Sequence, residues 1–158
     1  MNLKNSFKLM ACIAIPLIVG AVSGIATSSN IKTWYVYLNK PSFNPPNWVF
    51  APAWTILYIL MGISLFLITQ AKSSHIKSKA LYLFFMQLFL NFAWSFIFFY
   101  FHQVGWALVE IAFLWMSIIL MIRQFYKINS WSGYLQIPYL LWVSFASILN
   151  ASIWYLNS

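Results

Sequence analysis

The stretch that decides the fold is residues 34–61, WYVYLNKPSFNPPNWVFAPAWTILYILM. Its first half is polar and contains Pro41, Pro45 and Pro46, which disfavour helix and bias the chain toward extended and turn conformations. Its second half, from Trp48 onward, is apolar and free of charged residues. The stretch therefore predicts a proline-stiffened loop that leads directly into an apolar helix, with Trp and Tyr side chains concentrated around the junction.

The chain as a whole lacks the polar coat of a water-soluble protein. Of its 158 residues, 63% are hydrophobic and 6% are charged, whereas soluble domains carry about 25% charged residues. Five apolar runs follow one another, each of about 18–25 residues, the length that crosses a bilayer. We therefore expect an all-α membrane protein whose single domain, 1–158, is a bundle of five transmembrane helices. The expected helices are 9–27, 48–70, 80–101, 105–122 and 132–156, the last interrupted near Pro138.

The first apolar run has two interpretations. Its basic start and the small residues that follow also fit a cleaved signal peptide. The run is long for that purpose, and it contains Gly20-x-x-x-Gly24, a helix-packing pattern that a discarded segment would not need. We therefore keep residues 9–27 as the first helix.

Residues 28–47 form the long loop between the first two expected helices. The segment exceeds the 2–8 residues that usually join helices in bundles, and Lys32 and Lys40 mark it as water-facing. The segment is either a plain connector between the two helices or a functional loop. We expect a structured lid over a cavity. The residues that would shape this lid are Trp34, Lys40, Pro41, Pro45 and Pro46.

The formal net charge of +8 comes from cations that lie between the apolar runs rather than in a stripe, which does not favour nucleic acid as a partner. The positive-inside rule places the more basic loops in the cytoplasm. The N-terminus and the loops 71–79 and 123–130 would hold Lys4, Lys8, Lys72, Lys77, Lys79, Arg123 and Lys127, against Lys32 and Lys40 on the other side. We therefore expect a multi-pass protein of the bacterial cell membrane with a cytoplasmic N-terminus.

The sequence offers no motif for conventional catalysis. One acid, two His and one Cys among 158 residues provide neither a metal-ligand cluster nor paired carboxylates. We expect no metal and no required cofactor, and Cys12 to be a small packed hydrophobe. Glu110, the single acid, has two interpretations: a hydrogen-bonded structural acid near the membrane edge, or a proton-coupled or ligand-contacting group.

Polar and aromatic side chains recur at helical spacing in three of the expected helices. Inside a membrane such side chains turn inward, either to bond neighbouring helices or to line a cavity. The three sets are Gln87, Asn91, Trp94 and Ser95; Trp54, Tyr58 and Met61; and Trp142, Ala146 and Asn150. We expect helix bonding for Gln87 and Asn150, and a cavity lined by Asn91, Trp54 and Trp142.

Four motifs in this chain resemble those of the TspO/MBR family, the tryptophan-rich sensory proteins and mitochondrial translocator protein (peripheral-type benzodiazepine receptor). They occur in the family's order and cover nearly the whole chain. They are WYxxLxKPSFxPPxWVFxPxWxxLYxLMG at 34–62, QLxLNxAW at 87–94 followed by Phe98 and Phe99, QxGWALVE at 103–110, and PYLxWxxFAxxLN at 138–150.

The resemblance implies a five-helix bundle, usually a homodimer, with a pocket under the first loop that binds porphyrins such as protoporphyrin IX and heme. In some members the ligands are sterols or synthetic benzodiazepine-type drugs. The mammalian sterol pattern ends in a basic residue, whereas residues 149–158 of this chain contain neither Lys nor Arg. Mapped onto this sequence, the ligand residues would be Trp54, Tyr58, Asn91, Trp94, Trp106, Trp142 and Ala146.

Three functions are compatible with this resemblance. The first is a sensor or translocator that binds porphyrins and regulates tetrapyrrole metabolism or a stress response. The second is a light- and oxygen-dependent porphyrin-degrading enzyme, in which Trp54 and Trp142 would be the redox-active residues with the porphyrin ring held between them. The third is a transporter of lipophilic molecules such as sterols or porphyrins.

Overall fold

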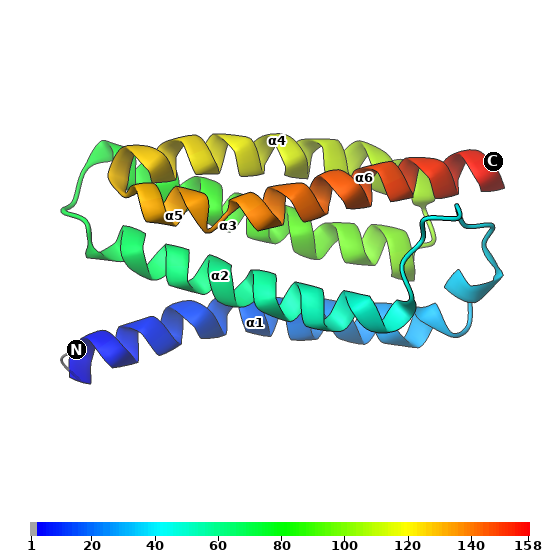
Figure 1. Cartoon of the computed structure of the whole chain (residues 1–158), viewed down its shortest axis with the longest axis horizontal. Helices are drawn as coiled ribbons and strands as arrows, with labels where there is room; N and C mark the ends of the chain where they lie inside the picture. The colour runs from blue at the N-terminus through cyan, green and yellow to red at the C-terminus, as the bar shows by residue number, and fades with distance from the viewer. Residues whose placement is uncertain (1–2) are drawn as a thin grey trace.

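The chain is helical along nearly all its length. A computed structural model describes residues 3–158, apart from the side chain of Ala26. In this range there are six α-helices: α1 (Leu3–Ile31), α2 (Phe50–Gln70), α3 (His75–Ser95), α4 (Val104–Ile128), α5 (Ser130–Tyr134) and α6 (Ile137–Asn157). Five helical segments of the described chain are long and apolar enough to cross a membrane. The two ends of the bundle carry opposite termini (Figure 1), and the predicted all-α, five-span fold is confirmed.

The helix ends reach further than the apolar runs that predicted them. α1 begins at Leu3 rather than residue 9, and α3 begins at His75 rather than residue 80. Nothing in these polar extensions breaks a helix, and the Ser74 hydroxyl caps α3 by accepting a hydrogen bond from the backbone N–H of Lys77 (3.1 Å). At the other end of the sequence, the predicted break near Pro138 is present, because the last span is divided into α5 and α6.

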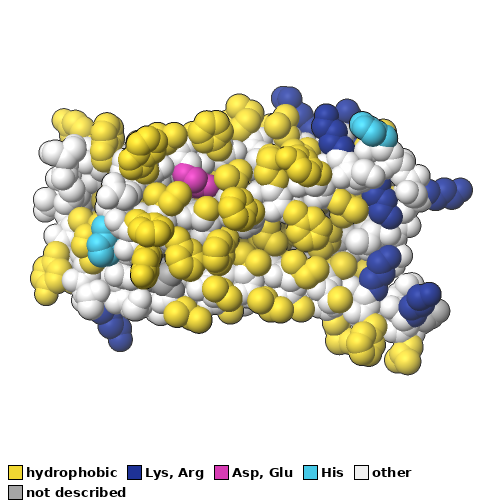
Figure 2. Space-filling view, turned by 180° about the vertical axis from the view of Figure 1, so that it is seen from behind, with side chains coloured by type: hydrophobic (Ala, Val, Ile, Leu, Met, Phe, Trp, Pro, Cys, Tyr) yellow, Lys and Arg dark blue, Asp and Glu magenta, His cyan; other side chains and the backbone are white. Residues whose placement is uncertain are grey.

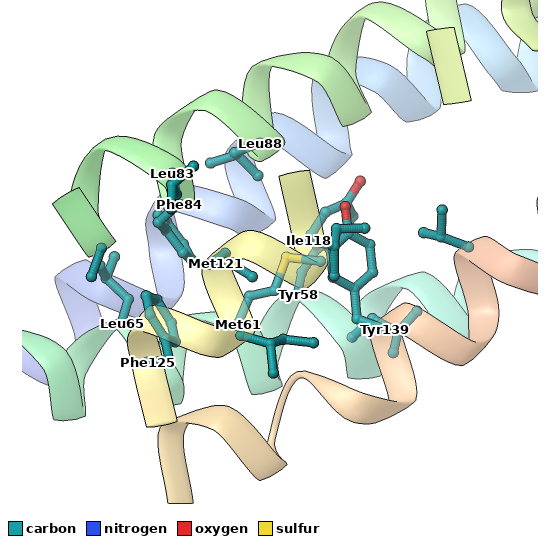
Figure 3. Packing of buried hydrophobic residues seen from close by; sticks show 14 of the residues in the cluster. Tyr58, Met61, Leu65, Leu83, Phe84, Leu88, Ile118, Met121, Phe125 and Tyr139 are labelled. Atoms are coloured by element: carbon teal, nitrogen blue, oxygen red, sulfur yellow. The ribbon is translucent and has the colours of Figure 1, made fainter. Parts of the chain in front are cut away.

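The core lies where α2, α3, α4 and α6 meet. Its buried side chains are large and apolar, and they come from all four helices (Figure 3). Examples are Met61 and Leu65 on α2, Phe84 on α3, Met121 and Phe125 on α4, and Tyr139 on α6. Each of these is at most 2% exposed, so the four helices form a packed scaffold around which α1 is added.

Helix α1 packs closely against α2 as far as Gly20 and less closely beyond it. A Cβ atom at Gly62 would clash with the backbone Cα of Ile13, and one at Gly20 would clash with the ring of Tyr58. In contrast, a Cβ atom at Gly24 would meet nothing within 4 Å. Within this chain the predicted packing role of the glycine pair therefore holds for Gly20, whereas Gly24 faces open space; packing of Gly24 against a second copy stays a prediction.

The surface divides into an apolar middle and a basic end. Figure 2 shows hydrophobic side chains over the middle of the molecule, with most of the visible Lys and Arg side chains gathered at one end. A bilayer requires this distribution, because exposed apolar side chains face the lipid and charges remain at the edges. The protein is a multi-pass membrane protein.

Candidate functional site

A cavity of about 420 Å³ lies toward the end of the bundle that carries the long loop. Its walls come from α1, α2, α6 and the end of α3, and its roof includes Tyr35 from the loop. This volume falls within the range of about 300–1,000 Å³ that is typical of small-molecule sites. Among the described residues that line the cavity, none is charged, so the site suits an apolar ligand with few polar groups.

Two indole rings dominate the wall shared by α2 and α6. The rings of Trp54 and Trp142 lie at 84° with 6.4 Å between centroids, and Trp54 stacks on Tyr58 at 5.4 Å. The two indoles contact each other edge to face, so no ring is held between them in this arrangement. This differs from the sequence-based expectation of a porphyrin sandwiched by these two residues.

A chain of buried hydrogen bonds supports this aromatic wall from behind. The Tyr58 hydroxyl donates to Asn91 Oδ1 (2.7 Å), Asn91 Nδ2 donates to the Tyr139 hydroxyl (3.3 Å), and that hydroxyl donates to Gln87 Oε1 (2.8 Å). The chain joins α2, α3 and α6 in the protein interior. Buried polar groups are stable only when paired, so the network fixes the position of Tyr58 at the cavity.

The wall on the α3 side depends on a change in helix geometry. Residues Phe96–Tyr100 form a π-helical turn, a form that occurs frequently at functional sites. Phe98 and Phe99 from this turn line the cavity, and Trp94 stacks on Phe98 at 5.1 Å. The Trp94 indole N–H donates to Asn150 Oδ1 (3.1 Å), which ties this wall to α6.

Tyr35 is the residue of the long loop that covers the cavity. Tyr35 is 4% exposed and packs against Phe98 and Phe99, with ring centroids 6.2 and 5.7 Å apart. Burial raises the pKa of Tyr35 to about 12. Its hydroxyl is therefore protonated at physiological pH, and it donates to Asn44 Oδ1 (2.8 Å).

Small side chains surround an opening on the lipid-facing surface. Ala21, Gly24 and Ser28 on α1 and Ala51 and Thr55 on α2 all line the cavity and are all exposed. Because residues of both helices are exposed along the same cavity, it opens sideways between α1 and α2.

The family model of the TspO/MBR family matches residues 12–156. The chain belongs to the TspO/MBR family.

Relatives of this TspO/MBR chain come from archaea, bacteria and animals. It is 41% identical over 157 residues to the tryptophan-rich protein TspO of Archaeoglobus fulgidus, an alignment that covers 98% of this chain and 99% of the relative. It is 36% identical to the tryptophan-rich sensory protein of Cereibacter sphaeroides over 78% of this chain and 77% of the relative. It is also 36% identical to the human translocator protein, over 77% of this chain and 73% of the relative.

The TspO/MBR motifs place most of the predicted ligand residues at one cavity. Trp54, Tyr58, Trp94, Trp142 and Ala146 line it. Asn91 does not line it: its side chain is 3% exposed and lies behind Tyr58 in the hydrogen-bond chain. As contacts to a bound ligand, all of these assignments stay predictions.

Trp106 is not brought to the cavity of this TspO/MBR chain. Its side chain is 68% exposed and lies on the outer side of α4, beside a separate shallow hollow that also includes Glu110. Neither Glu110 oxygen has a hydrogen-bond partner among the described residues. The expectation of a hydrogen-bonded structural acid is therefore not met, and the carboxyl group does not line the cavity either.

The predicted lid residues shape the loop without lining the cavity. Lys40 Nζ donates to the carbonyl oxygens of Tyr35, Val36 and Leu38 at 2.8–3.1 Å. The Pro41 carbonyl accepts from the Asn44 N–H (3.0 Å) and closes a turn. Lys40 thus uses its three donors within the loop, and it is unavailable for pairing with a ligand.

The α1 wall is the part of the site that sequence reasoning missed. Gly20, Gly24, Thr27 and Ser28 all line the cavity. The available signal was the run of small residues at 20–29, which is unusual in an otherwise bulky apolar span. The Gly20-x-x-x-Gly24 pattern predicts helix packing, which within this chain is observed at Gly20, and both glycines line the cavity.

Proposed function

We propose that this chain binds a porphyrin, such as protoporphyrin IX or heme, in the cavity beneath the loop. We further propose that it acts as a membrane sensor or translocator that regulates tetrapyrrole metabolism or a stress response. The observation that carries the proposal is the uncharged aromatic cavity formed by Trp54, Tyr58 and Trp142. A flat macrocycle buries a large apolar area against such rings. The words "sensory" and "translocator" in the names of its relatives support the wider role.

The propionate groups of a porphyrin need a cation at the edge of this uncharged cavity. Lys40 is committed to three backbone carbonyls. Lys32 is exposed and directly follows Ile31, which lines the cavity. We therefore assign the propionate contact to Lys32, as a charge-assisted hydrogen bond at the water-facing rim.

The test is a titration of purified protein with protoporphyrin IX. Replacing both Trp54 and Trp142 with Phe should weaken binding by about tenfold, because each indole is replaced by a smaller phenyl ring and the pair loses about 1–2 kcal/mol of apolar contact with the ligand. Binding should be followed through the absorbance of the porphyrin, since the substitutions remove two fluorescent reporters.

The matched control is the double variant Trp48→Phe and Trp131→Phe. Both side chains are more than 70% exposed and neither lines the cavity. This control should bind protoporphyrin IX as the unchanged protein does. Equal affinity in both double variants would show that the aromatic wall is not the porphyrin site.

We also propose that the protein lies in a prokaryotic cell membrane with its N-terminus in the cytoplasm. The basic end of the molecule carries the N-terminus and the α2–α3 loop, which supports this orientation. Ser42→Cys, in the long loop, should react with a membrane-impermeant maleimide on intact cells, whereas Ser73→Cys should react only after lysis. The reverse pattern would contradict the orientation; Cys12 is buried and contributes little background.

Other expectations rest on the family resemblance. Assembly as a homodimer, binding of sterols or benzodiazepine-type ligands, light-dependent porphyrin breakdown and transport of lipophilic molecules stay predictions.

A further inference from the structure

The loop between α1 and α2 is rigid within itself. We use the term lid for residues 32–46, the part of the loop between the end of α1 and the short helical turn that precedes α2. Its two legs are tied together by the Tyr35–Asn44 hydrogen bond (2.8 Å) and by Lys40, which donates to three carbonyls. Prolines restrict the backbone between these ties. The lid is therefore expected to move as one body rather than to unravel.

One side of the lid is anchored by aromatic contacts of Trp34, which is half-buried. The Trp34 ring stacks on His102 at 4.2 Å, and its edge meets Phe98 at 5.7 Å. His102 Nε2 lies 3.1 Å from Asn30 Oδ1, and its backbone has a positive φ of 57°, an uncommon conformation for a residue other than glycine. These contacts hold the start of the lid to the end of α3 and to the α3–α4 turn.

The other side is held mainly by the last residue of α6, beside a longer bond from Asn39 Nδ2 to the Leu156 carbonyl oxygen (3.4 Å). The backbone N–H of Asn39 donates to Asn157 Oδ1, and Asn157 Nδ2 donates to the Asn39 carbonyl oxygen, both at 2.9 Å. The Asn157 side chain thus pairs with the lid backbone as a neighbouring strand would. It also donates to the Ile153 carbonyl (2.7 Å), which fixes its orientation. Both asparagines are exposed.

The two attachments differ in strength. The aromatic anchor removes apolar surface from water, whereas exposed hydrogen bonds exchange with bonds to water and contribute little net stability. The nearby contact between Phe43 and Phe145 is loose, with centroids 6.3 Å apart and Phe43 47% exposed. The side of the lid over α6 is therefore the side that releases first.

We propose that Asn157 is the latch of the lid: the lid pivots about Trp34, separates from Asn157 and lifts Tyr35, its one residue in the cavity lining, and so opens the water-facing end of the cavity beside Ile153. Asn157 does not line the cavity, so it acts as a positioning residue. That the opening limits exchange of a porphyrin rests on the proposed function. Charged propionates favour this water-facing route, because carrying them through hydrocarbon is costly.

The latch can be tested without any ligand by hydrogen exchange of single backbone amides, measured by NMR. In Asn157→Ala, the Asn39 amide should exchange about tenfold faster, because its acceptor is gone. The Asn44 amide, bonded inside the lid to Pro41 (3.0 Å), should keep its rate. An unchanged rate at Asn39 would show that the latch does not exist, and equal acceleration at Asn44 would show that the lid is not rigid.

The gating step is tested by the rates of protoporphyrin IX exchange. In Asn157→Ala, the association and dissociation rate constants should both rise about tenfold, a change of about 1.4 kcal/mol, while the Kd stays within about twofold. Tyr155→Ala is the control, since this side chain is 79% exposed in the same turn; its rates should not change. Faster exchange of the Asn39 amide with unchanged ligand rate constants would overturn the gating and would indicate that the ligand uses the opening between α1 and α2.

Failure of the unchanged protein to bind protoporphyrin IX would refute the proposed function. It would leave the measurement of Asn39 amide exchange, and so the test of the latch, intact.

Discussion

Replacing Ala146 with Phe should weaken protoporphyrin IX binding by about a hundredfold. Ala146 lines the cavity on α6, one turn after Trp142. A benzyl group in its place occupies volume that the ligand requires. Forcing extra atoms into a site that the ligand fills costs about 1–3 kcal/mol, and a cost near the top of that range corresponds to a loss of affinity of about a hundredfold. The measurement is the Kd from a porphyrin absorbance titration.

The control for this variant is Ala112→Phe. Ala112 is exposed on α4 and lies outside the cavity lining, so the same group is added toward the lipid. Ala112→Phe should bind normally. The Ala146→Phe protein should also unfold at an unchanged or higher temperature, because it fills an empty space. Tight porphyrin binding by folded Ala146→Phe would place the ligand elsewhere on the molecule.

Replacing Gly62 with Ala should lower the free energy of unfolding by about 2 kcal/mol. A Cβ atom here would clash with the backbone Cα of Ile13 and lie 2.9 Å from the Cys12 carbonyl oxygen. Backbone atoms cannot move aside as the end of a flexible side chain can, so α1 must shift away from α2. Overpacking costs about 1–3 kcal/mol, whereas replacing glycine with alanine favours the helix by about 1 kcal/mol. Because backbone atoms are in the way, we expect an overpacking cost near the upper end of its range, which leaves the net loss of about 2 kcal/mol. Thermal unfolding in one fixed detergent measures the loss.

The same substitution at Gly24 should have the opposite effect on the stability of the protein. Gly24 lies in the same helix pair, but a Cβ atom there meets nothing within 4 Å. Gly24→Ala should therefore keep or raise the unfolding temperature, since alanine favours the helix by up to about 1 kcal/mol. If the two variants unfold alike, close contact between α1 and α2 at Gly62 does not stabilise the protein.

Most of the fold was predictable because the bilayer imposes a simple rule on sequence. Apolar runs of spanning length had to be helices, and the five spans were found that way. The helix ends were predicted less well, because α1 and α3 continue into polar residues that no hydropathy pattern separates from a loop. Their true ends depend on local bonds such as the Ser74 cap, which can form only once the backbone is in place.

The site was predicted in part, through motifs and not through periodicity alone. Helical spacing and family resemblance brought Trp54, Tyr58 and Trp142 together correctly as cavity-lining residues. Asn91 was expected at the cavity and instead lies one layer behind it, because both its amide atoms bond buried tyrosines. Whether a polar residue bonds helices or faces a cavity depends on partners far away in sequence, which spacing within one helix does not reveal.

The sideways opening between α1 and α2 has a consequence for how affinity is expressed. A neutral, apolar molecule that enters there arrives from the hydrocarbon phase, so its effective concentration is moles per mole of lipid and not moles per litre of water. Its apparent Kd should rise in proportion to the amount of lipid or detergent added, since added hydrocarbon dilutes the dissolved ligand. A charged porphyrin that exchanges under the lid follows the aqueous concentration instead. The same cavity can thus take up ligands from the hydrocarbon phase and from water, and a titration with lipid distinguishes the two classes of ligand.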